Sequence, residues 1–387
     1  MRIPLCVFAL ALSAYAADET PKPADAPEQA PAAQTADAPK PADATPPAPP
    51  PKYGGWVFSG LADGYVTHNG NKPALDYNQL QNFDIHSGAP RFSFGKFTLD
   101  KSDSVIGVHA DIGVGETMRL IHAGDPAAQE HKGLRYFEQM YLIIKPKNAH
   151  GAEIDYGQFV TSAGAEVIES SSNWNYTRSI LFAWAIPYYH FGLRTSVPVN
   201  KELTVGFQLV NAWNTVWGEH NMSNVGLTLA YTKPKFVYSA VYYVGKSDPG
   251  ATARVRNLFD TTILVSPTSK FSLYINGNYG RNNFVGGKHA LWYGVAGAAR
   301  YQITRIFAVA GRTEYFKDKD GFATGQVQNL KEGTATLEGK VNDHLVARFE
   351  VRHDSSDHFF FDRGKLSPSR GMNTVTLGIV ALLGPLK

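Results

Sequence analysis

Over most of this chain, apolar and polar residues alternate almost without interruption. In residues 343–354, for example, Phe349 and Val351 alternate with Arg348 and Glu350. A period of two places successive side chains on opposite faces of a β-strand. No stretch keeps a helical period of about 3.6 residues for more than about two turns. The chain therefore has to fold from strands whose two faces meet different surroundings.

The connections between the expected strands alternate in length. Short ones such as "NK", "KPK" and "ND" alternate with longer ones such as residues 68–89 and 161–184. A soluble sandwich has no reason to keep this order, whereas an outer-membrane barrel has short turns on one rim, longer loops on the other and an even strand number. We therefore predict an all-β fold, a transmembrane antiparallel up-and-down β-barrel of about 16 strands. The strands are expected near residues 56–67, 90–101, 104–115, 134–145, 151–160, 185–198, 201–213, 222–232, 235–246, 253–266, 269–281, 288–302, 305–317, 326–340, 343–354 and 371–383.

The composition of the chain agrees with a membrane barrel. Aromatic residues make up 12% of it, and several of them, such as Tyr279, Trp292 and Phe316, lie toward strand ends. Aromatic rings suit the headgroup level of a membrane, where one end is apolar and the other wet. The formal net charge is only +3. Because Lys and Arg are dispersed along the chain, no nucleic-acid binding is expected.

The first 52 residues are expected to lie outside the barrel. Residues 1–16 are typical of a secretory signal peptide, with a basic start, an apolar run and a small-x-small cleavage site. The single cysteine, Cys6, lies inside this signal, so the mature chain has neither disulfides nor thiolate metal sites. Residues 17–52 are a Pro/Ala-rich segment, for which a disordered periplasmic linker and a spacer toward the cell wall both stay open. Residues 53–387 are assigned to the barrel.

A barrel of this size is expected to enclose a water-filled interior, lined by the polar face of each strand. Opposed rows of acidic and basic side chains would set a transverse field there and filter solutes by charge and size. A solvated face without any filtering role is the alternative. The candidate pore-lining or constriction residues are Asp155, Glu166, Glu169, Arg178, His190, Arg194, Arg312, Glu314, Arg348, Glu350 and Arg352.

One long connection has an unusual composition. Residues 161–184 include the apolar run "ILFAWA", which is far too short to span a bilayer as a helix. By analogy with general porins, we expect this third outer loop to fold inward and narrow the pore. Glu166, Glu169 and Arg178 would then face the channel. The alternative is that the apolar run extends the sixth strand into the membrane.

Metal-dependent and enzymatic functions find little support in the sequence. Residues 353–362 are rich in His and Asp, but their spacing matches no defined metal site, so neither a metal nor a cofactor is expected. The chain has no G-x-S-x-G, H-E-x-x-H or phosphate-binding glycine motif. Ser170–Ser172 beside Glu169 are more typical of a polar loop than of a hydrolase site. We therefore expect no enzymatic activity.

Several segments carry a resemblance to a known family. They include "FSGLADGYVTHN", "GFQLVNAWN", "RFEVRHDSSDHFFF…NTVTLGIV" and, most specifically, "GAEVIE…YTRS…IPYYHFG". In these segments the chain resembles the OmpL-like outer-membrane β-barrel porin family, over essentially all of residues 53–383. The resemblance implies an outer-membrane, porin-like channel. The ending "LLGPLK" departs from the terminal aromatic residue that such barrels often carry for assembly.

The expected function is passive diffusion of small hydrophilic solutes through a porin in the outer membrane of a Gram-negative envelope. The alternative is a non-conducting surface barrel whose outer loops bind a ligand or partner, as an adhesin does. An outer-membrane enzyme is a third, weaker hypothesis. The expected partners are outer-membrane lipids, the solutes and the outer-membrane insertion machinery. Association into a homotrimer stays open.

Overall fold

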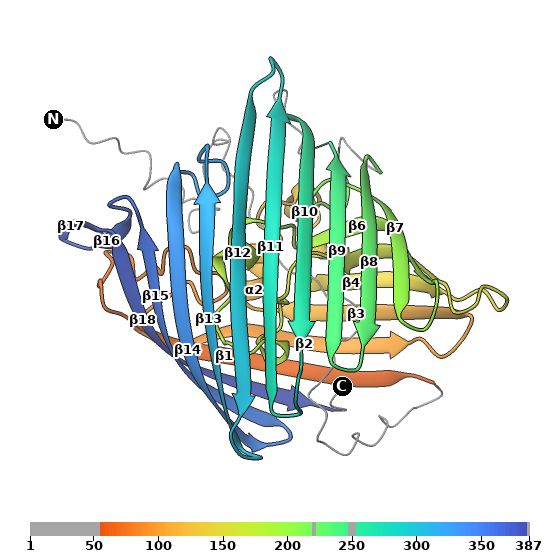
Figure 1. Cartoon of the computed structure of the whole chain (residues 1–387), viewed down its shortest axis with the longest axis horizontal. Helices are drawn as coiled ribbons and strands as arrows, with labels where there is room; N and C mark the ends of the chain where they lie inside the picture. Colours follow the sequence, from red (N-terminus) through yellow and green to blue (C-terminus); the bar gives the residue numbers. More distant parts are fainter. Residues whose placement is uncertain (1–54, 219–221, 247–252, 385–387) are drawn as a thin grey trace.

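The strands pair in antiparallel order into a closed barrel of sixteen strands (Figure 1). The computed structural model describes residues 55–218, 222–246 and 253–384. The expected signal peptide, the Pro/Ala-rich segment and the last three residues of "LLGPLK" lie outside the described residues. The barrel strands are β1 (Val57–Asn69), β2 (Arg91–Lys101), β3 (Ile106–Val114), β4 (Phe137–Ile144), β5 (Glu153–Val160), β6 (Tyr189–Pro198), β7 (Leu203–Val210), β8 (Asn224–Lys233), β9 (Phe236–Gly245), β10 (Ala253–Val265), β11 (Phe271–Phe284), β12 (His289–Gln302), β13 (Phe307–Asp318), β14 (Gln328–Asn342), β15 (Leu345–Ser356) and β18 (Gly371–Leu383).

Each barrel strand pairs with its neighbours along the chain, and the first strand closes the sheet against the last. Gly60 of β1 pairs with Leu383 of β18, and Asn69 pairs with Thr374. Closure leaves no barrel strand with an unpaired edge, which removes a site of aggregation. The predicted up-and-down topology and the predicted strand number are both confirmed.

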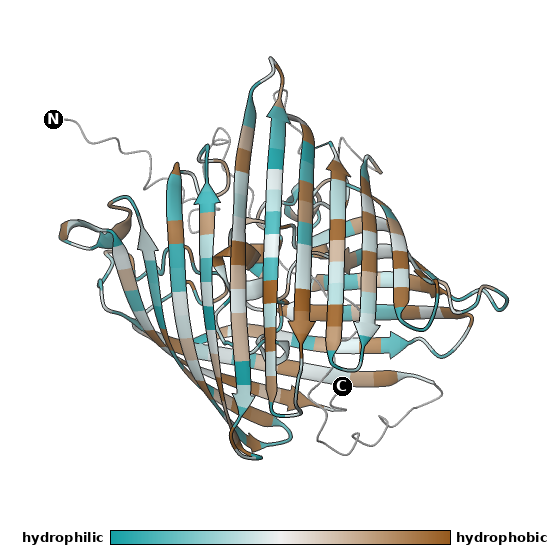
Figure 2. Cartoon of the chain, viewed as in Figure 1, coloured by the Kyte–Doolittle hydropathy of each residue, from teal (hydrophilic) through white to brown (hydrophobic). Residues whose placement is uncertain are grey.

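Alternate residues of each strand face opposite sides of the barrel wall. On β15, Phe349 and Val351 are exposed on the outer surface, whereas Arg348 and Glu350 are buried inside. Figure 2 shows hydrophobic and hydrophilic positions interspersed along β8 to β13. An apolar outer face suits lipid tails, which offer no hydrogen bonds to polar groups. The alternation read from the sequence therefore separates a lipid-facing surface from an interior.

The long connections lie on one rim. The first three are loop 1 (residues 70–90), loop 2 (residues 115–136) and loop 3 (residues 161–188). One connection is shorter than predicted. The expected long loop at residues 282–287 comprises only residues 285–288, because β11 continues to Phe284. The alternation of short and long connections is otherwise as expected.

Short helices and one small hairpin lie in the long connections. No helix among the described residues is long and apolar enough to cross a membrane. Loop 2 contains α2 (Glu116–Ile121), α3 (Pro126–Glu130) and η2 (Leu134–Tyr136), and loop 3 contains η3 (Ser170–Ser172) and α4 (Ile180–Trp184). The connection between β15 and β18 contains a hairpin of β16 (Phe361–Arg363) and β17 (Leu366–Ser369).

Loops 1, 2 and 3 fill the long-loop half of the barrel with a hydrophobic core. Phe83 of loop 1, Met118 of loop 2 and Phe182 of loop 3 belong to one buried cluster with the wall residues Trp292 and Phe316. The expectation that the interior faces water is therefore wrong at this level, because the loops carry their own apolar side chains inward. Trp292 and Phe316 lie in this core and not at the headgroup level as predicted.

Candidate gate inside the barrel

Loop 3 crosses the inside of the barrel between β5 and β6. Its apolar run forms helix α4, whose N-cap Ser179 accepts a hydrogen bond from the N–H of Phe182 at 3.0 Å. A serine at this position satisfies one of the otherwise unpaired N–H groups of the first turn. The strand β6 begins only at Tyr189, after this helix. The alternative that the apolar run extends the sixth strand is therefore wrong.

Two glutamates of the barrel wall hold the main chain of loop 3. Glu314 of β13 accepts hydrogen bonds from the N–H groups of Ile180 and Leu181 at 2.6 and 3.0 Å. Glu350 of β15 accepts from the N–H of Tyr176 at 2.7 Å. Buried main-chain N–H groups need an acceptor, and the oxygens of a carboxyl group can accept several hydrogen bonds. Both glutamates therefore act as acceptors that fix the course of the loop.

Tyr176 anchors the middle of loop 3 against the wall. Its hydroxyl donates to Asp63 of β1, which also accepts the hydroxyl of Ser170. The ring lies directly on Gly378 of β18, where an added Cβ would be 2.1 Å from the Tyr176 Cδ2 atom. The Tyr65 ring is also close, with centroids 6.0 Å apart. Only glycine leaves room for the tyrosine at this point of the wall.

Three arginines of the barrel wall bind loop 3 as hydrogen-bond donors. Arg312 also forms ion pairs with Glu166 of loop 3 at 2.6 Å and with Glu332 of β14 at 3.1 Å. These side chains are buried, and a buried guanidinium is stable only when its donors are paired. The wall arginines donate to main-chain carbonyl groups as follows: Arg312 to Thr177, Arg348 to Ser170 and Arg352 to Arg178.

Further ion pairs join other interior charges. Arg352 pairs with Asp354 at 2.7 Å within β15, and Arg348 pairs with Glu338 of β14 at 2.7 Å. The register of β14 and β15 brings the second pair together, because Arg348 lies directly opposite Glu338 in their strand pairing. Charges of both signs are thus matched within the wall as well as between wall and loop.

Lys96 of β2 joins loop 3 to the part of the wall formed by β2, β3 and β4. Its ammonium lies 3.2 Å from Asp111 and 3.0 Å from Glu138, and it also contacts Glu169 of loop 3. The three carboxylates form the single group among the described residues that has the spacing of a metal site. The lysine already supplies a cation between them, so the cluster is explained without a metal.

Loop 1 adds a buried acid to this interior. Asp84 is buried, and neither of its carboxylate oxygens has a hydrogen-bond partner among the described residues. Burial raises the pKa of Asp84 from 3.8 to about 7, although Arg352 and Arg178 act in the opposite direction. Nearby Glu350 opposes ionisation as well. Asp84 can therefore change its charge within the physiological pH range.

The structure brings most of the eleven predicted site residues together. Their side chains form ion pairs and hydrogen bonds within the protein and do not face open water. The pair formed by Asp155 and Arg194, with atoms 2.7 Å apart, lies separately between β5 and β6. His190 is buried against the ring of Tyr243, with centroids 4.6 Å apart, and neither ring nitrogen has a hydrogen-bond partner among the described residues. The remaining eight residues, Glu166, Glu169, Arg178, Arg312, Glu314, Arg348, Glu350 and Arg352, contact loop 3 or belong to it.

Sequence reasoning missed several members of this network. The predicted site lacks Asp63, Lys96, Glu138 and Glu332, although each is bonded within the network. Asp63, Glu138 and Glu332 are buried, and the side chain of Lys96 is 10% exposed. The period-two pattern places Asp63 and Glu332 on the inner face of their strands. The period-two pattern alone would therefore have identified Asp63 and Glu332 as interior residues. Their partners on loop 3 could not be found in this way, because the loop has no repeating pattern.

A closed sixteen-stranded barrel with an apolar outer face, an internal charge network and an inward loop has the architecture of an outer-membrane porin-like channel. Residues 56–383 match the family described as "Putative beta-barrel porin-2, OmpL-like". The chain belongs to this family, which confirms the resemblance seen in its sequence. No curated protein is significantly similar to the chain in sequence.

Solved structures of porins have a similar fold. The anion-selective porin from Comamonas acidovorans superposes with a TM-score of 0.57 at 10% identity, covering 85% of this chain and 99% of that chain. The outer membrane channel DcaP of Acinetobacter baumannii gives 0.57 at 10% identity, with 85% and 97% covered. The trimer form of OmpT of Vibrio cholerae gives 0.54 at 10% identity, with 84% and 98% covered. At these identities the likeness concerns the fold alone.

Proposed function

We propose that this protein is a channel for passive diffusion of small hydrophilic solutes across the outer membrane, with loop 3 as its gate. The observation that carries the proposal is the set of wall carboxylates and arginines that bind the main chain of loop 3 inside the barrel. A loop held by separate, reversible polar contacts can be displaced without unfolding the wall. Solutes would then be filtered by the width left beside the loop and by the wall charges that it uncovers.

This mechanism implies a small resting conductance. Loop 3 fills the interior with apolar side chains such as Leu181 and Phe182, which belong to the same buried cluster as Trp292 of the wall. Water and ions avoid such a packed apolar region, because entering it would cost them their hydration. Solutes therefore pass when the loop moves aside, and the pore-lining role of residues such as Arg312 and Glu350 belongs to that open state.

The same apolar packing favours one alternative, a non-conducting barrel that binds a ligand or partner through its outer loops. Under this alternative the interior core serves only to hold loops 1, 2 and 3 in place as a recognition surface. An enzymatic role finds no such support. The Ser170 hydroxyl that could serve a hydrolase donates to Asp63, and no histidine contact of Ser170 occurs among the described residues. We expect no enzymatic activity.

Planar-bilayer conductance of the purified full-length protein separates the channel from the alternative. The wild type is expected to give small, discrete openings, and deletion of residues 163–175 is expected to raise the conductance several-fold and to widen the size limit for solutes. A chain with Glu202→Gln, in an exposed short turn, serves as the control for folding and insertion. Silent bilayers for both the wild type and the deletion, with folded barrels, would support the non-conducting alternative.

A second, milder variant tests the same proposal if the deletion variant does not fold. Replacing both Glu314 and Glu350 by Gln removes two carboxylate anchors while leaving the length of loop 3 unchanged. More frequent or larger openings are expected than in the wild type. Swelling of liposomes in sugars, amino acids and organic acids then identifies the class of solute, for each variant that conducts.

We also propose that the barrel associates into a homotrimer through its shorter side. The strands β4, β5 and β7 have only 8 residues, whereas β11 and β12 have 14. A membrane-spanning strand needs about 9–11 residues, so the shorter side matches a bilayer poorly unless other copies cover it. Phe207 and Leu227 are exposed there.

Light scattering in detergent should give three chains per particle. The variant Phe207→Lys should give one chain per particle. A wild-type monomer would contradict the proposal.

A further inference from the structure

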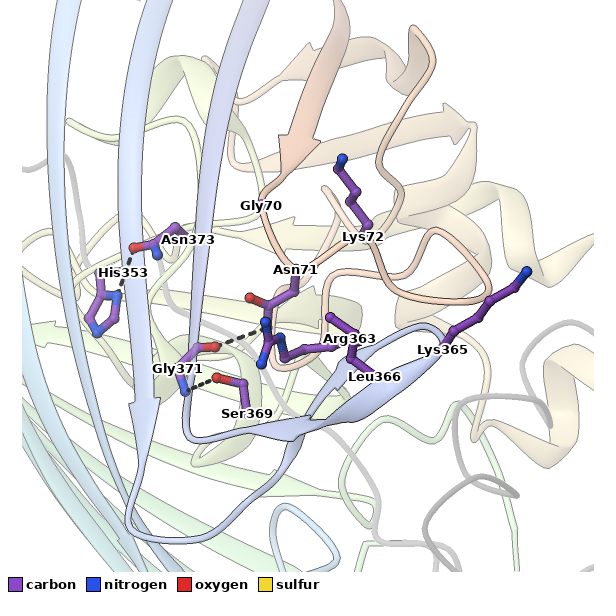
Figure 3. A pocket seen from close by; sticks show the side chains of 10 residues that line it. All are labelled: Gly70, Asn71, Lys72, His353, Arg363, Lys365, Leu366, Ser369, Gly371 and Asn373. Atoms are coloured by element: carbon purple, nitrogen blue, oxygen red, sulfur yellow. Dashed lines mark hydrogen bonds between the residues drawn. The ribbon is translucent and has the colours of Figure 1, made fainter.

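A pocket of about 790 Å³ lies at the long-loop rim, beside the hairpin of β16 and β17 (Figure 3). Its residues come from three places that are distant in sequence: the beginning of loop 1, the end of β15 with the start of β18, and the hairpin itself. The network of loop 3 contributes no residue to it. The pocket is therefore separate from the gate.

The lining of the pocket is basic. Lys72, Arg363, Lys365 and His353 line it, and all four are exposed to solvent. No acidic residue lines the pocket. Among the residues that the structure describes, none forms an ion pair or hydrogen bond with the side chains of Lys72, Arg363 and Lys365. Basic side chains gathered without acidic partners repel one another. Such an arrangement favours an anionic ligand.

Asp362, which precedes Arg363 in the hairpin, already binds the main chain. Asp362 accepts hydrogen bonds from the N–H of Ala74 at 2.7 Å and from the N–H of Gly364 at 2.9 Å. These bonds hold the hairpin against loop 1. The hairpin is further fixed by Phe361, which is wholly buried in the core. The walls of the pocket are thus set by packing and hydrogen bonds before any ligand arrives.

The position of the pocket relative to the membrane follows from the strands. His353 is two residues beyond Val351 on the outward face of β15, and Asn373 is two residues before Val375 on the outward face of β18. Val351 and Val375 belong to the exposed apolar surface. Two residues of a strand rise about 7 Å. The pocket therefore opens just above the apolar band, at the headgroup level of the outer leaflet.

We propose that this pocket binds the phosphorylated headgroup of an outer-leaflet glycolipid. The ammonium groups of Lys72 and Lys365 and the guanidinium of Arg363 would contact the phosphate oxygens. Leu366, which is 61% exposed beside them, would contact the apolar part of the same lipid. Basic pockets at the membrane surface recognise anionic headgroups in this manner. A lipid held here would also cover the hairpin and stabilise it against loop 1.

Native mass spectrometry of the full-length protein in detergent, mixed with diphosphorylated lipid A, tests the proposal. One lipid is expected to stay bound per barrel. Combined replacement of Lys72, Arg363 and Lys365 by Gln is expected to weaken binding by about tenfold or more, because each charge contributes to the attraction. Replacement of Lys147, Lys201 and Lys235 by Gln removes the same charge from exposed positions on the opposite rim and should leave binding unchanged.

Two further probes decide whether a lipid is the ligand. Lipid A without its phosphates is expected to bind much more weakly than the diphosphorylated form, and equal binding would overturn the proposal. Inorganic phosphate is expected to compete only at far higher concentration than lipid A. Competition at equal concentration would identify a site for free anions and would equally overturn a lipid site. Unchanged lipid A binding by the pocket variant, with a folded barrel, would do the same.

Discussion

At the scale of single residues, Glu350 combines several contacts that hold loop 3. Its carboxylate accepts hydrogen bonds from the N–H groups of Tyr176 and Thr177, at 2.7 and 3.1 Å, and from the hydroxyl of Thr336 at 2.7 Å. Glu350→Gln replaces one acceptor oxygen by a donor amide that faces these donors. We expect a loss of about 1–3 kcal/mol in the free energy of unfolding.

Urea unfolding in detergent, followed by circular dichroism, measures this loss. Glu202→Gln is the matched control, because Glu202 is exposed in a short turn. The same change there is expected to alter stability by less than about 0.5 kcal/mol. Equal effects of the two substitutions would show that the contacts of Glu350 with loop 3 contribute nothing to stability.

Asp84 leads to a prediction about pH. Burial raises its pKa to about 7, so the folded protein keeps a proton that the unfolded chain releases near pH 3.8. The neutral Asp84 carboxyl contributes its full share to the free energy of unfolding below pH 3.8, where the unfolded chain is also protonated. This share is lost as the pH rises from there through the pKa of about 7 in the folded protein. The loss is at most about 4 kcal/mol, from about 1.4 kcal/mol for each pKa unit. Unfolding free energies of the wild type should therefore fall between pH 4 and pH 8.

Asp84→Asn isolates this contribution, because Asn has the same shape and no charge. The variant should lose less stability than the wild type over the same pH range, while His86 and the other titrating groups contribute equally to both chains. Parallel pH profiles for the two proteins would mean that Asp84 does not keep its proton in the folded state.

At the scale of elements, loop 3 and β18 fit together through one glycine. An added Cβ at Gly378 would lie 2.1 Å from the ring of Tyr176, so Gly378→Ala must displace that ring and the loop attached to it. We expect a destabilisation of about 1–3 kcal/mol from overpacking. We also expect longer or more frequent openings in planar bilayers, because the displaced loop blocks the barrel less completely.

Gly311→Ala provides the control for this prediction. Gly311 is also within a barrel strand, but the nearest heavy atom to an added Cβ there is 3.8 Å away. The control should therefore keep wild-type stability and conductance. If both alanine variants conduct alike, the contact between Tyr176 and Gly378 has no part in closing the barrel.

At the scale of the whole molecule, closure of the barrel depends only on the strands. The ladder partners of β1 are β2 and β18, and all sixteen barrel strands lie between Val57 and Leu383. A chain that lacks residues 17–52 is therefore expected to refold in detergent to the same barrel. Heat-modifiable migration on gels and the circular dichroism spectrum check this outcome. Failure to fold would show that this segment is needed to form the barrel.

The sequence by itself determined the wall of this protein. Alternation along the strands predicted sixteen of them, their order and the inward direction of residues such as Arg348 and Glu350. A period of two is a local property, because each side chain follows directly from the backbone of its own strand. The predicted boundaries failed mainly where a strand meets a loop, as between β11 and β12.

Only the tertiary structure decided what fills the barrel. Glu314 and Ile180 are separated by 134 residues, and no repeating pattern indicates that one binds the main chain of the other. Alternation shows that Glu314 points inward, but it does not show what lies opposite it. Loop 3 carries apolar side chains inward because burying them there removes them from water. That packing turns an interior expected to hold water into a packed, charge-paired core.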